Sequence, residues 1–210
     1  MINLFITRHG ETEWNTQRRL QGWRNSPLTE KGIAQGNMLR DAVKKYNITK
    51  IYTSTSERAL KTAMAARGKT TIPVELMDEL REMNMGDWEG RTIDEINERE
   101  PENFSNYWNA PHLFVKNTGE DFDEILDRSK KAIEKILEEE KEGNILIVTH
   151  GVTLKALMSH FSDEGFIHFW TKPVVMQASI SLIEVEDIDL GEIKLYGDVS
   201  HFELGEKGEN

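Results

Sequence analysis

The sequence predicts an α/β fold, a three-layer α/β/α sandwich whose central sheet is mainly parallel and has an antiparallel C-terminal edge. Three short apolar runs, at residues 2–7, 48–53 and 145–148, are separated by segments with helical periodicity. Strands connected through helices form parallel sheets that carry helices on both faces. Two extended runs, at 178–186 and 192–197, flank a short Asp-Ile-Asp-Leu-Gly segment, which indicates a hairpin of edge strands.

The first half of the chain is expected to supply two helices and a further strand. Apolar residues recur at the helical period over residues 29–46. Ser56 precedes a second helical run over 57–67, and Gly68 closes it. A short strand is predicted at 72–76, and an acidic stretch without clear periodicity follows it.

The second half contains the most amphipathic helix of the chain, which runs from Phe122 to at least Leu137. We expect it to end at Gly143, because a glycine suits the left-handed position after a helix. The acidic run at 138–140 near its end is expected to face solvent. Another helix is predicted over residues 152–161, directly after the third apolar strand.

The chain has 210 residues and contains neither an internal repeat nor a low-complexity linker. At about 100–200 residues per domain, we expect a single domain over residues 1–210. The segment at about 91–121 lies between the acidic stretch and the long helix, and we interpret it as a lid or insertion over one end of the sheet. Its aromatic side chains are Phe104, Tyr107, Trp108 and Phe114.

The composition excludes several classes of function. There are 26 Lys and Arg against 37 Asp and Glu, a formal net charge of −11, which argues against a nucleic-acid partner because phosphate neutralisation needs a basic face. The absence of cysteine excludes zinc-thiolate sites, iron–sulfur clusters and thiol nucleophiles. No targeting segment and no run of about 20 apolar residues is visible. We therefore expect a cytoplasmic protein with no membrane partner.

Polar motifs follow each of the three apolar strands. Arg-His-Gly-Glu-Thr occupies residues 8–12, Ser-Thr-Ser-Glu-Arg occupies 54–58, and Thr-His-Gly occupies 149–151. Because ligands bind at the carboxyl ends of parallel strands, two arginines and two histidines are expected to meet at one place. Arginine guanidinium groups, glycine-rich turns and helix N-termini all favour phosphate. These motifs predict a phosphate-like anion site.

The residues alone leave the reacting group open. No Gly-x-Ser-x-Gly elbow and no phosphate-binding Gly-x-x-x-x-Gly-Lys loop occurs, which disfavours a serine hydrolase and a P-loop enzyme. The histidines show no metal-ligand spacing, so we expect neither a metal ion nor a cofactor. Histidine can attack phosphorus itself. The remaining candidate nucleophiles are the histidines together with Ser54, Ser56, Thr149 and Thr153.

At this point the motifs resemble the histidine phosphatase superfamily. The segment 8–12, followed by Asn15 and the Gln21-Gly22 pair, is similar to the branch that contains the cofactor-dependent phosphoglycerate mutases and their phosphatase relatives. Further matching segments follow in the family's order, and the resemblance covers about residues 1–202. They are 54–63, 80–90, 119–120 and 149–151.

The resemblance implies a two-step phosphoryl transfer. His9 would attack phosphorus as a neutral imidazole, and Arg8, Arg58 and His150 would hold the oxygens of the phosphoryl group. Glu82 would protonate the leaving oxygen and then deprotonate the water that clears the phosphohistidine.

The choice of Glu82 comes from the family motif. The residues alone do not distinguish Glu82 from four other carboxylates of that stretch as the candidate acid and base: Asp78, Glu79, Asp87 and Glu89. The same resemblance implies that further residues contact phosphate or substrate, namely Asn15, Gln21, Gly22 and Gly151. The other four histidines match no motif position, and we expect them to be structural or surface groups: His112, His160, His168 and His201.

Three functions remain to be compared. The mutases of this branch usually carry an Arg and a Tyr after the glutamate and a longer, basic insertion. Here Met83 and Asn84 follow Glu82, and the insertion is aromatic and largely acidic. The resemblance thus favours a metal-independent phosphatase that acts on a small phosphorylated metabolite, with an apolar or bulky leaving group. A phosphoglycerate mutase is the alternative, and a non-catalytic binding or signalling protein with the same fold is a second one.

Overall fold

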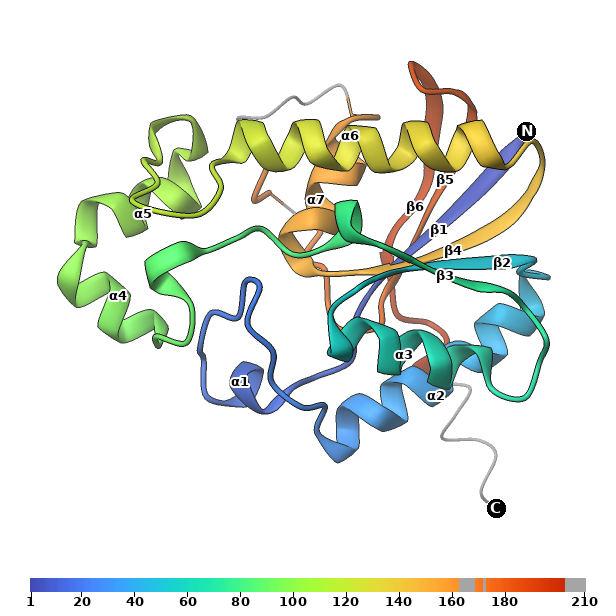
Figure 1. Ribbon diagram of the computed structural model, residues 1–210, viewed down its shortest axis with the longest axis horizontal. Coiled ribbons are helices and arrows are strands. Elements are labelled where there is room, and N and C mark those ends of the chain that lie inside the picture. The colour runs from blue at the N-terminus through green and yellow to red at the C-terminus, as the bar shows by residue number, and fades with distance from the viewer. Residues whose placement is uncertain (163–168, 172, 203–210) are drawn as a thin grey trace.

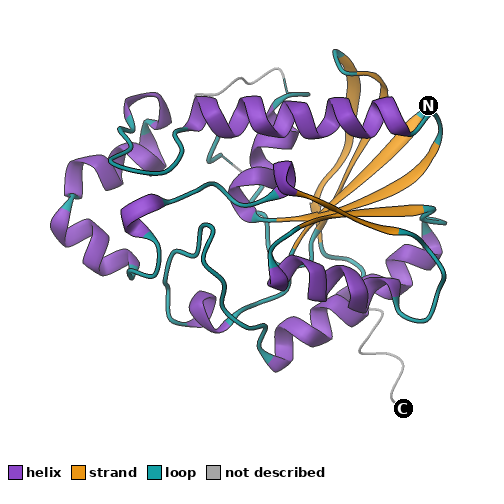
Figure 2. Ribbon diagram, viewed as in Figure 1, coloured by secondary structure: helices purple, strands orange, loops and turns teal. Residues whose placement is uncertain are grey.

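The structure is a computed structural model that describes residues 1–162, 169–171 and 173–202. Its strands are β1 (Ile2–Arg8), β2 (Lys50–Ser54), β3 (Val74–Met77), β4 (Gly143–Thr149), β5 (Ile180–Asp187) and β6 (Leu190–Asp198). They form one sheet with the order β3-β2-β4-β1-β5-β6 (Figure 2). The pairs among β3, β2, β4 and β1 are parallel, whereas β5 runs antiparallel to both β1 and β6. The predicted mixed sheet is confirmed.

Helices cover both faces of the sheet, as the sequence predicts (Figure 1). The α-helices are α1 (Glu13–Thr16), α2 (Glu30–Lys45), α3 (Glu57–Arg67), α4 (Ile93–Arg99), α5 (Pro101–Asn109), α6 (Phe122–Glu139) and α7 (Gly151–Ser159). Helices α2 and α3 lie on one face, and α6 and α7 lie on the other. Short 3-10 turns are η1 (Asp78–Leu80), η2 (Gly86–Trp88) and η3 (Pro111–Leu113).

The alternation of side chains along β1 explains why the sheet needs both helical layers. Leu4 and Ile6 are buried with residues of α6 and α7 such as Ile133. Phe5 points to the opposite face and packs with Leu39 of α2. Successive strand residues face opposite sides of the sheet. A strand that is apolar at every position must therefore be covered by helices on both faces.

The end of α6 differs from the sequence-based expectation. The helix ends at Glu139, and Gly143, with φ of 121°, is already the first residue of β4. The expected solvated acidic run is confirmed for Glu138 and Glu139, which are exposed. Glu140 differs, because it is half-buried and pairs with Lys50 of β2 at 2.8 Å, and the Tyr52 hydroxyl donates to Glu139 over 2.7 Å. These β2 side chains anchor the helix end above the sheet before Gly143 is reached.

The segment 91–121 folds as α4, α5 and η3 beyond the carboxyl ends of the parallel strands (Figure 1). It buries Ile96 and Tyr107 against an apolar cluster that includes Trp88 and Phe122. The aromatic side chains of the insertion therefore contribute to a core of their own. Across the described residues, no helix combines the length and apolar character needed to cross a membrane.

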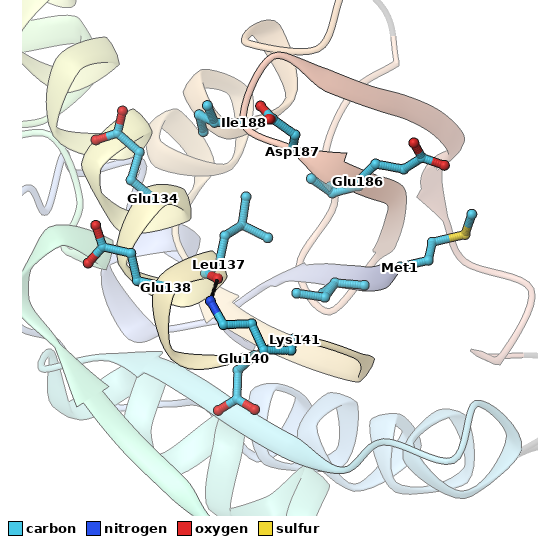
Figure 3. A pocket seen from close by; sticks show the side chains of 11 residues that line it. Met1, Glu134, Leu137, Glu138, Glu140, Lys141, Glu186, Asp187 and Ile188 are labelled. Atoms are coloured by element: carbon cyan, nitrogen blue, oxygen red, sulfur yellow. Dashed lines mark hydrogen bonds between the residues drawn. The ribbon is translucent and has the colours of Figure 1, made fainter.

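A hollow of about 410 Å³ lies at the other end of the sheet, between the end of α6 and β5 (Figure 3). Its rim carries more carboxylates than cations: Glu134, Glu138, Glu140, Glu186 and Asp187, with Lys141. Ile2 lines this hollow, and the length of β1 separates it from the residues after Arg8 by roughly 20 Å. An acidic rim of this kind does not favour a phosphate.

Candidate active site

The carboxyl ends of β1, β4 and β2 bring the predicted residues together. Arg8 pairs with Thr149, and Thr53 pairs with Val148, so the three strands end side by side. The residues that follow place the rings of His9 and His150 with their centroids 5.1 Å apart. The side chains of both histidines are buried. The predicted convergence of polar groups is therefore present in the structure.

The loop after β1 is held by contacts that leave no room for a side chain at Gly10. The His9 amide donates to the Thr149 carbonyl over 2.9 Å, and the Gly10 amide donates to the Thr62 hydroxyl over 3.0 Å. A Cβ on Gly10 would lie 2.3 Å from the carbonyl oxygen of Gly32 in α2. Only glycine permits this close approach, which fixes the direction in which His9 leaves the strand.

The surroundings of His9 select one form of its imidazole. Nδ1 lies 2.7 Å from the Gly10 carbonyl, which can only accept, so Nδ1 carries the proton. Nε2 receives an N–H from Nε of Arg58 over 3.2 Å, so Nε2 carries the lone pair. Burial, together with the charges of Arg58 and Arg8, lowers the pKa of His9 well below its usual 6.5. The ring is thus a neutral imidazole with a lone pair directed toward a guanidinium.

Arg58 extends from the first turn of α3 and is buried to 1% exposure. Its Nη2 donates to the Gly22 carbonyl and its Nη1 to the Arg24 carbonyl, each over 2.8 Å. Burial lowers its pKa to about 10, so it still carries a charge at neutral pH. The loop that contains Gly22 is thereby closed over the guanidinium.

Arg8 and His150 each present a nitrogen that no group in the described part of the chain contacts by a hydrogen bond. Nη1 of Arg8 donates to the Val175 carbonyl over 3.1 Å, and Nε2 of His150 lies 2.8 Å from Oγ of Ser54. Nε of Arg8 and Nδ1 of His150 are buried and have no hydrogen-bond partner among the described residues. Unpaired buried polar groups are costly, and in this cationic setting they fit an anionic ligand.

Glu82 lies in the loop between η1 and η2, and its side chain contacts the first turn of α7, beside Arg8 and His150. Its Oε1 accepts the Thr153 amide over 3.2 Å, and its Oε2 accepts the Val152 amide over 3.3 Å. A Cβ on Gly151 would lie 3.8 Å from this Oε2 and 3.6 Å from Nε of Arg8. The carboxylate and the guanidinium of Arg8 therefore flank one small space next to His150.

The structure separates Glu82 from the other carboxylates of its stretch. Each of the other four is engaged away from the histidines or faces solvent: Asp78 accepts the Thr55 hydroxyl, Glu79 pairs with Lys135, Glu89 accepts the Trp23 and Arg24 amides, and Asp87 is exposed. The residue that the family motif singles out is thus the one that lies beside Arg8.

The residues of the first loop form a network around Thr12. Oδ1 of Asn15 accepts the Thr12 amide over 3.0 Å, within the cap of α1. Nε2 of Gln21 donates to the Thr12 hydroxyl over 2.7 Å, and its Oε1 is buried without a partner among the described residues. In this structure Asn15 stabilises the loop, while Gly22 contacts Arg58 through its carbonyl.

Sequence reasoning did not single out Arg128 of α6, which holds the segment before and at Glu82. Nε and Nη2 of Arg128 each lie 2.7 Å from the carboxylate of Glu120. Its remaining N–H groups donate to three backbone carbonyls, those of Glu79, Arg81 and Glu82. The Gly119-Glu120 motif was the available signal, because Glu120 is the partner of this arginine.

Tyr107 of α5 is one of the aromatic side chains of the insertion. Its side chain is buried, and burial, followed by the charge of Glu82, raises the pKa of its hydroxyl well above the usual 10. Arg8 also acts on this group electrostatically. The insertion therefore brings one protonated phenol into the neighbourhood of Arg8 and Glu82.

The other histidines lie apart from this site or outside the described residues. His112 is exposed, His201 is buried, and Nε2 of His160 lies 2.9 Å from the Ile188 carbonyl. His168 lies outside the described residues. Within the described part of the chain, no group of three or more His, Asp or Glu side chains is placed to hold a metal ion.

Comparison with known proteins places this geometry in a family. The family model for the histidine phosphatase superfamily (branch 1) matches residues 4–198. The solved structure of YhfR from Bacillus stearothermophilus is 44% identical, with a TM-score of 0.91, and the alignment covers 96% of this chain and 99% of that one.

Two curated relatives carry names that differ in activity. A metal-independent phosphoserine phosphatase from Arabidopsis thaliana is 30% identical over 205 residues, which cover 96% of this chain and 83% of the relative. A probable phosphoglycerate mutase GpmB from Escherichia coli O1:K1 is 34% identical over 166 residues, which cover 76% of this chain and 74% of the relative.

Proposed function

The chain belongs to the histidine phosphatase superfamily, as a phosphoric monoester hydrolase, and on that premise we propose that it hydrolyses phosphomonoesters through a phosphohistidine on Nε2 of His9. The observation that carries the proposal is the neutral His9 ring. Its proton is held at Nδ1 by the Gly10 carbonyl, and its Nε2 lone pair faces Arg58 at 3.2 Å. A histidine in this form is ready to attack phosphorus without first losing a proton.

In the first step, Nε2 of His9 forms a bond to phosphorus while the bond between phosphorus and the ester oxygen breaks. The proposed acid is Glu82, which gives a proton to the leaving oxygen so that an alcohol departs. Its position beside Arg8, on the small space next to Gly151, supports this role.

In the second step, a water molecule attacks the phosphorus of the phosphohistidine. Glu82 now accepts the proton from this water, the N–P bond breaks, and inorganic phosphate leaves with His9 restored to the neutral form. The same carboxylate thus acts first as an acid and then as a base, and the proton count closes over one turnover.

Arg8, Arg58 and His150 are proposed to hold the three equatorial phosphoryl oxygens. Nε of Arg8 and Nδ1 of His150, which have no partner among residues 1–162, 169–171 and 173–202, would supply donors to these oxygens, and Nε of Arg58 already points at the attacking nitrogen. Fixed donors in a buried site stabilise the charge that spreads over these oxygens. With two guanidinium groups in place, the transfer is proposed to need no metal ion, in line with the name of the Arabidopsis relative.

The substrate is proposed to be a small phosphorylated metabolite with an apolar or bulky leaving group. Within the single domain that we propose, segment 91–121 would act as the lid that selects this group. Its support is the buried Tyr107 near Arg8 and Glu82 and the aromatic packing around it. Lys116, one of the few cations of the insertion, pairs with Asp121 instead of facing the site.

The mutase remains the alternative, because the E. coli relative carries that name. A mutase must grip the carboxylate of phosphoglycerate, and the aromatic insertion offers little positive charge for this. Asn15, Gln21, Gly22 and Gly151 stay predicted phosphate or substrate contacts. The cytoplasmic location and the absence of nucleic-acid and membrane partners also stay predictions, which fractionation of the native host's cells and direct binding assays would test.

Hydrolysis of p-nitrophenyl phosphate in the presence of EDTA tests the proposal. We expect turnover by the unmodified enzyme and none by the His9→Ala variant. Activity that requires added metal, or that survives His9→Ala, would contradict it. Conversion of 3-phosphoglycerate in the presence of a bisphosphoglycerate primer, without release of phosphate, would instead support the mutase. No hydrolysis across a broad panel of phosphomonoesters would favour the non-catalytic alternative.

A further inference from the structure

Ser54, the last residue of β2, makes a contact that the two-step scheme does not use. Its Oγ lies 2.8 Å from Nε2 of His150, and the side chains of both residues are fully buried. The same Oγ accepts the backbone amide of Ser56 over 3.2 Å. We propose that Ser54 is a positioning residue that fixes the proton of His150 on Nδ1, a role that rests on the proposed phosphoryl transfer.

The hydroxyl proton of Ser54 determines which ring nitrogen of His150 accepts a hydrogen bond. Among the described residues, Nε2 of His150 is the single acceptor within hydrogen-bond reach of that hydroxyl, because the other partner of Oγ is an N–H donor. Were Nε2 of His150 protonated, Oγ would receive two donors and its own proton would be buried without an acceptor. Buried polar groups avoid that outcome. The serine hydroxyl therefore donates, and Nε2 of His150 accepts.

The charge state of His150 then determines where its own proton lies. Burial, with the charges of Arg58 and Arg8, lowers the pKa of His150 well below 6.5, so the ring is neutral and carries one proton. Since Nε2 accepts, that proton sits on Nδ1, the ring nitrogen that is buried without a partner among the described residues. This N–H is the donor that a phosphoryl oxygen requires.

The consequence is a division of labour between the two histidines. In His9 the Gly10 carbonyl holds the proton on Nδ1 and leaves Nε2 as a nucleophile. In His150 a hydroxyl donor fixes the same tautomer but leaves Nδ1 as a hydrogen-bond donor. One backbone acceptor and one side-chain donor thus assign opposite roles to two neutral rings that lie 5.1 Å apart.

Ser56 provides a matched control for this proposal. It is also a buried serine, two residues along, and its Oγ has no partner among the described residues. It makes no side-chain cap contact to α3 either. Replacing Ser56 by alanine therefore removes a hydroxyl of the same size from the same turn without removing a hydrogen bond.

The test is ¹⁵N NMR of the histidine rings at pH 7.5, with His150 assigned by loss of its signals in a His150→Gln variant. In the unmodified protein we expect His150 to be protonated on Nδ1. Ser54→Ala should move proton occupancy to Nε2 and lower kcat/KM for p-nitrophenyl phosphate by up to about 10²- to 10³-fold, as for loss of one oxyanion donor. Ser56→Ala should leave the tautomer unchanged, and Ser54→Thr, which keeps a hydroxyl, should keep the Nδ1 tautomer.

An unmodified His150 protonated on Nε2, or a Ser54→Ala variant that keeps both the Nδ1 proton and full activity, would overturn the role of Ser54. The spectrum of the unmodified protein serves as the test even if Ser54→Ala does not fold. The NMR result does not depend on turnover. An inactive enzyme with the expected tautomer would thus refute the phosphatase proposal and leave the tautomer assignment standing.

Discussion

Nε of Arg58 lies 3.2 Å from Nε2 of His9, and the two side chains are buried together. A guanidinium can only donate, so this contact requires the imidazole nitrogen to be bare. The guanidinium of Arg58 can therefore make this contact only while Nε2 of His9 carries a free lone pair. A phosphoryl group that bonds to this nitrogen takes the N–H of Arg58 as its own hydrogen-bond donor.

Replacement of Arg58 by lysine tests whether the shape of the guanidinium matters beyond its charge. Lysine keeps the charge but cannot donate to His9, Gly22 and Arg24 at once, as the arginine does. We expect kcat/KM for p-nitrophenyl phosphate to fall by about 10²- to 10³-fold. The matched control is Arg67→Lys at the other end of α3, where the guanidinium donates to the Thr70 carbonyl and to no other group that the structure describes.

Arg67→Lys should leave kcat/KM nearly unchanged. Equal losses for the two lysine variants would mean that Arg58 acts only through the stability of α3. Thermal unfolding of both variants, followed by circular dichroism, separates these outcomes.

The lowered pKa values of His9 and His150 predict a pH dependence of stability. The unfolded chain binds a proton at each histidine below its ordinary pKa of 6.5, whereas the folded protein does not until its lower pKa is reached. The stability is therefore present above pH 6.5 and is lost as the pH falls. Between pH 7.5 and 5.5 each histidine should lower the free energy of unfolding by roughly 1.4 kcal/mol, about 2.7 kcal/mol together.

His9→Asn removes one of these two contributions, because asparagine does not titrate, while burial and the two arginines still lower the pKa of His150. Urea denaturation at both pH values should show a change in the free energy of unfolding that is about 1.4 kcal/mol smaller in the variant. If the two proteins have the same pH dependence, then His9 titrates in the folded state as it does in the unfolded chain.

Glu82→Gln tests the proposed acid and base. Glutamine keeps one acceptor oxygen for the Thr153 amide, but its NH₂ group cannot accept the Val152 amide, so the substitution keeps the size of the side chain and loses one hydrogen bond. Loss of proton transfer to the leaving group should lower kcat/KM, which reports the first step alone, by about 10²- to 10⁴-fold for alkyl phosphates. The loss should be smaller for p-nitrophenyl phosphate, whose leaving group departs without a proton.

Glu89→Gln is the matched control, because Glu89 also accepts backbone amides in this stretch but binds the Trp23 loop. Glu89→Gln should change kcat/KM by the same factor for alkyl phosphates and for p-nitrophenyl phosphate. Should the alkyl and aryl substrates respond equally to Glu82→Gln, the residue is not the acid.

Arg128 is expected to act through the position of Glu82. Arg128→Lys removes the two-point contact with Glu120 and the donors to the carbonyls around Glu82. We expect turnover of alkyl phosphates to fall more than that of p-nitrophenyl phosphate, the same selectivity as for Glu82→Gln but smaller in size. Steady-state kinetics with both substrates measures this ratio.

The control for Arg128 is Lys135→Gln on the same helix. Lys135 is half exposed and pairs with the side chain of Glu79, so it contacts the same segment without holding its backbone. Its removal should leave the ratio of the two rates unchanged. A ratio that is also unchanged in Arg128→Lys would show that this arginine is structural only.

The fold and the location of the site follow from local patterns in the sequence. Apolar runs such as Leu4-Phe5-Ile6 must be buried on both faces, and polar motifs after parallel strands must converge. The identity of Glu82 required the family motif, because the carboxylates around it differ only in what they contact across the fold. The same limitation applies to the end of α6, where contacts from Lys50 and Tyr52 to the acidic run have no local signature.

The phosphoenzyme itself is the most direct test of the mechanism. The unmodified protein is mixed with p-nitrophenyl phosphate in EDTA and quenched within milliseconds into alkaline denaturant, where the N–P bond of phosphohistidine survives. Mass spectrometry of the peptides should then find one phosphoryl group, on His9. A phosphoryl group on Ser54, Ser56 or any residue other than His9, or p-nitrophenol release without a covalent intermediate, would contradict phosphoryl transfer through His9.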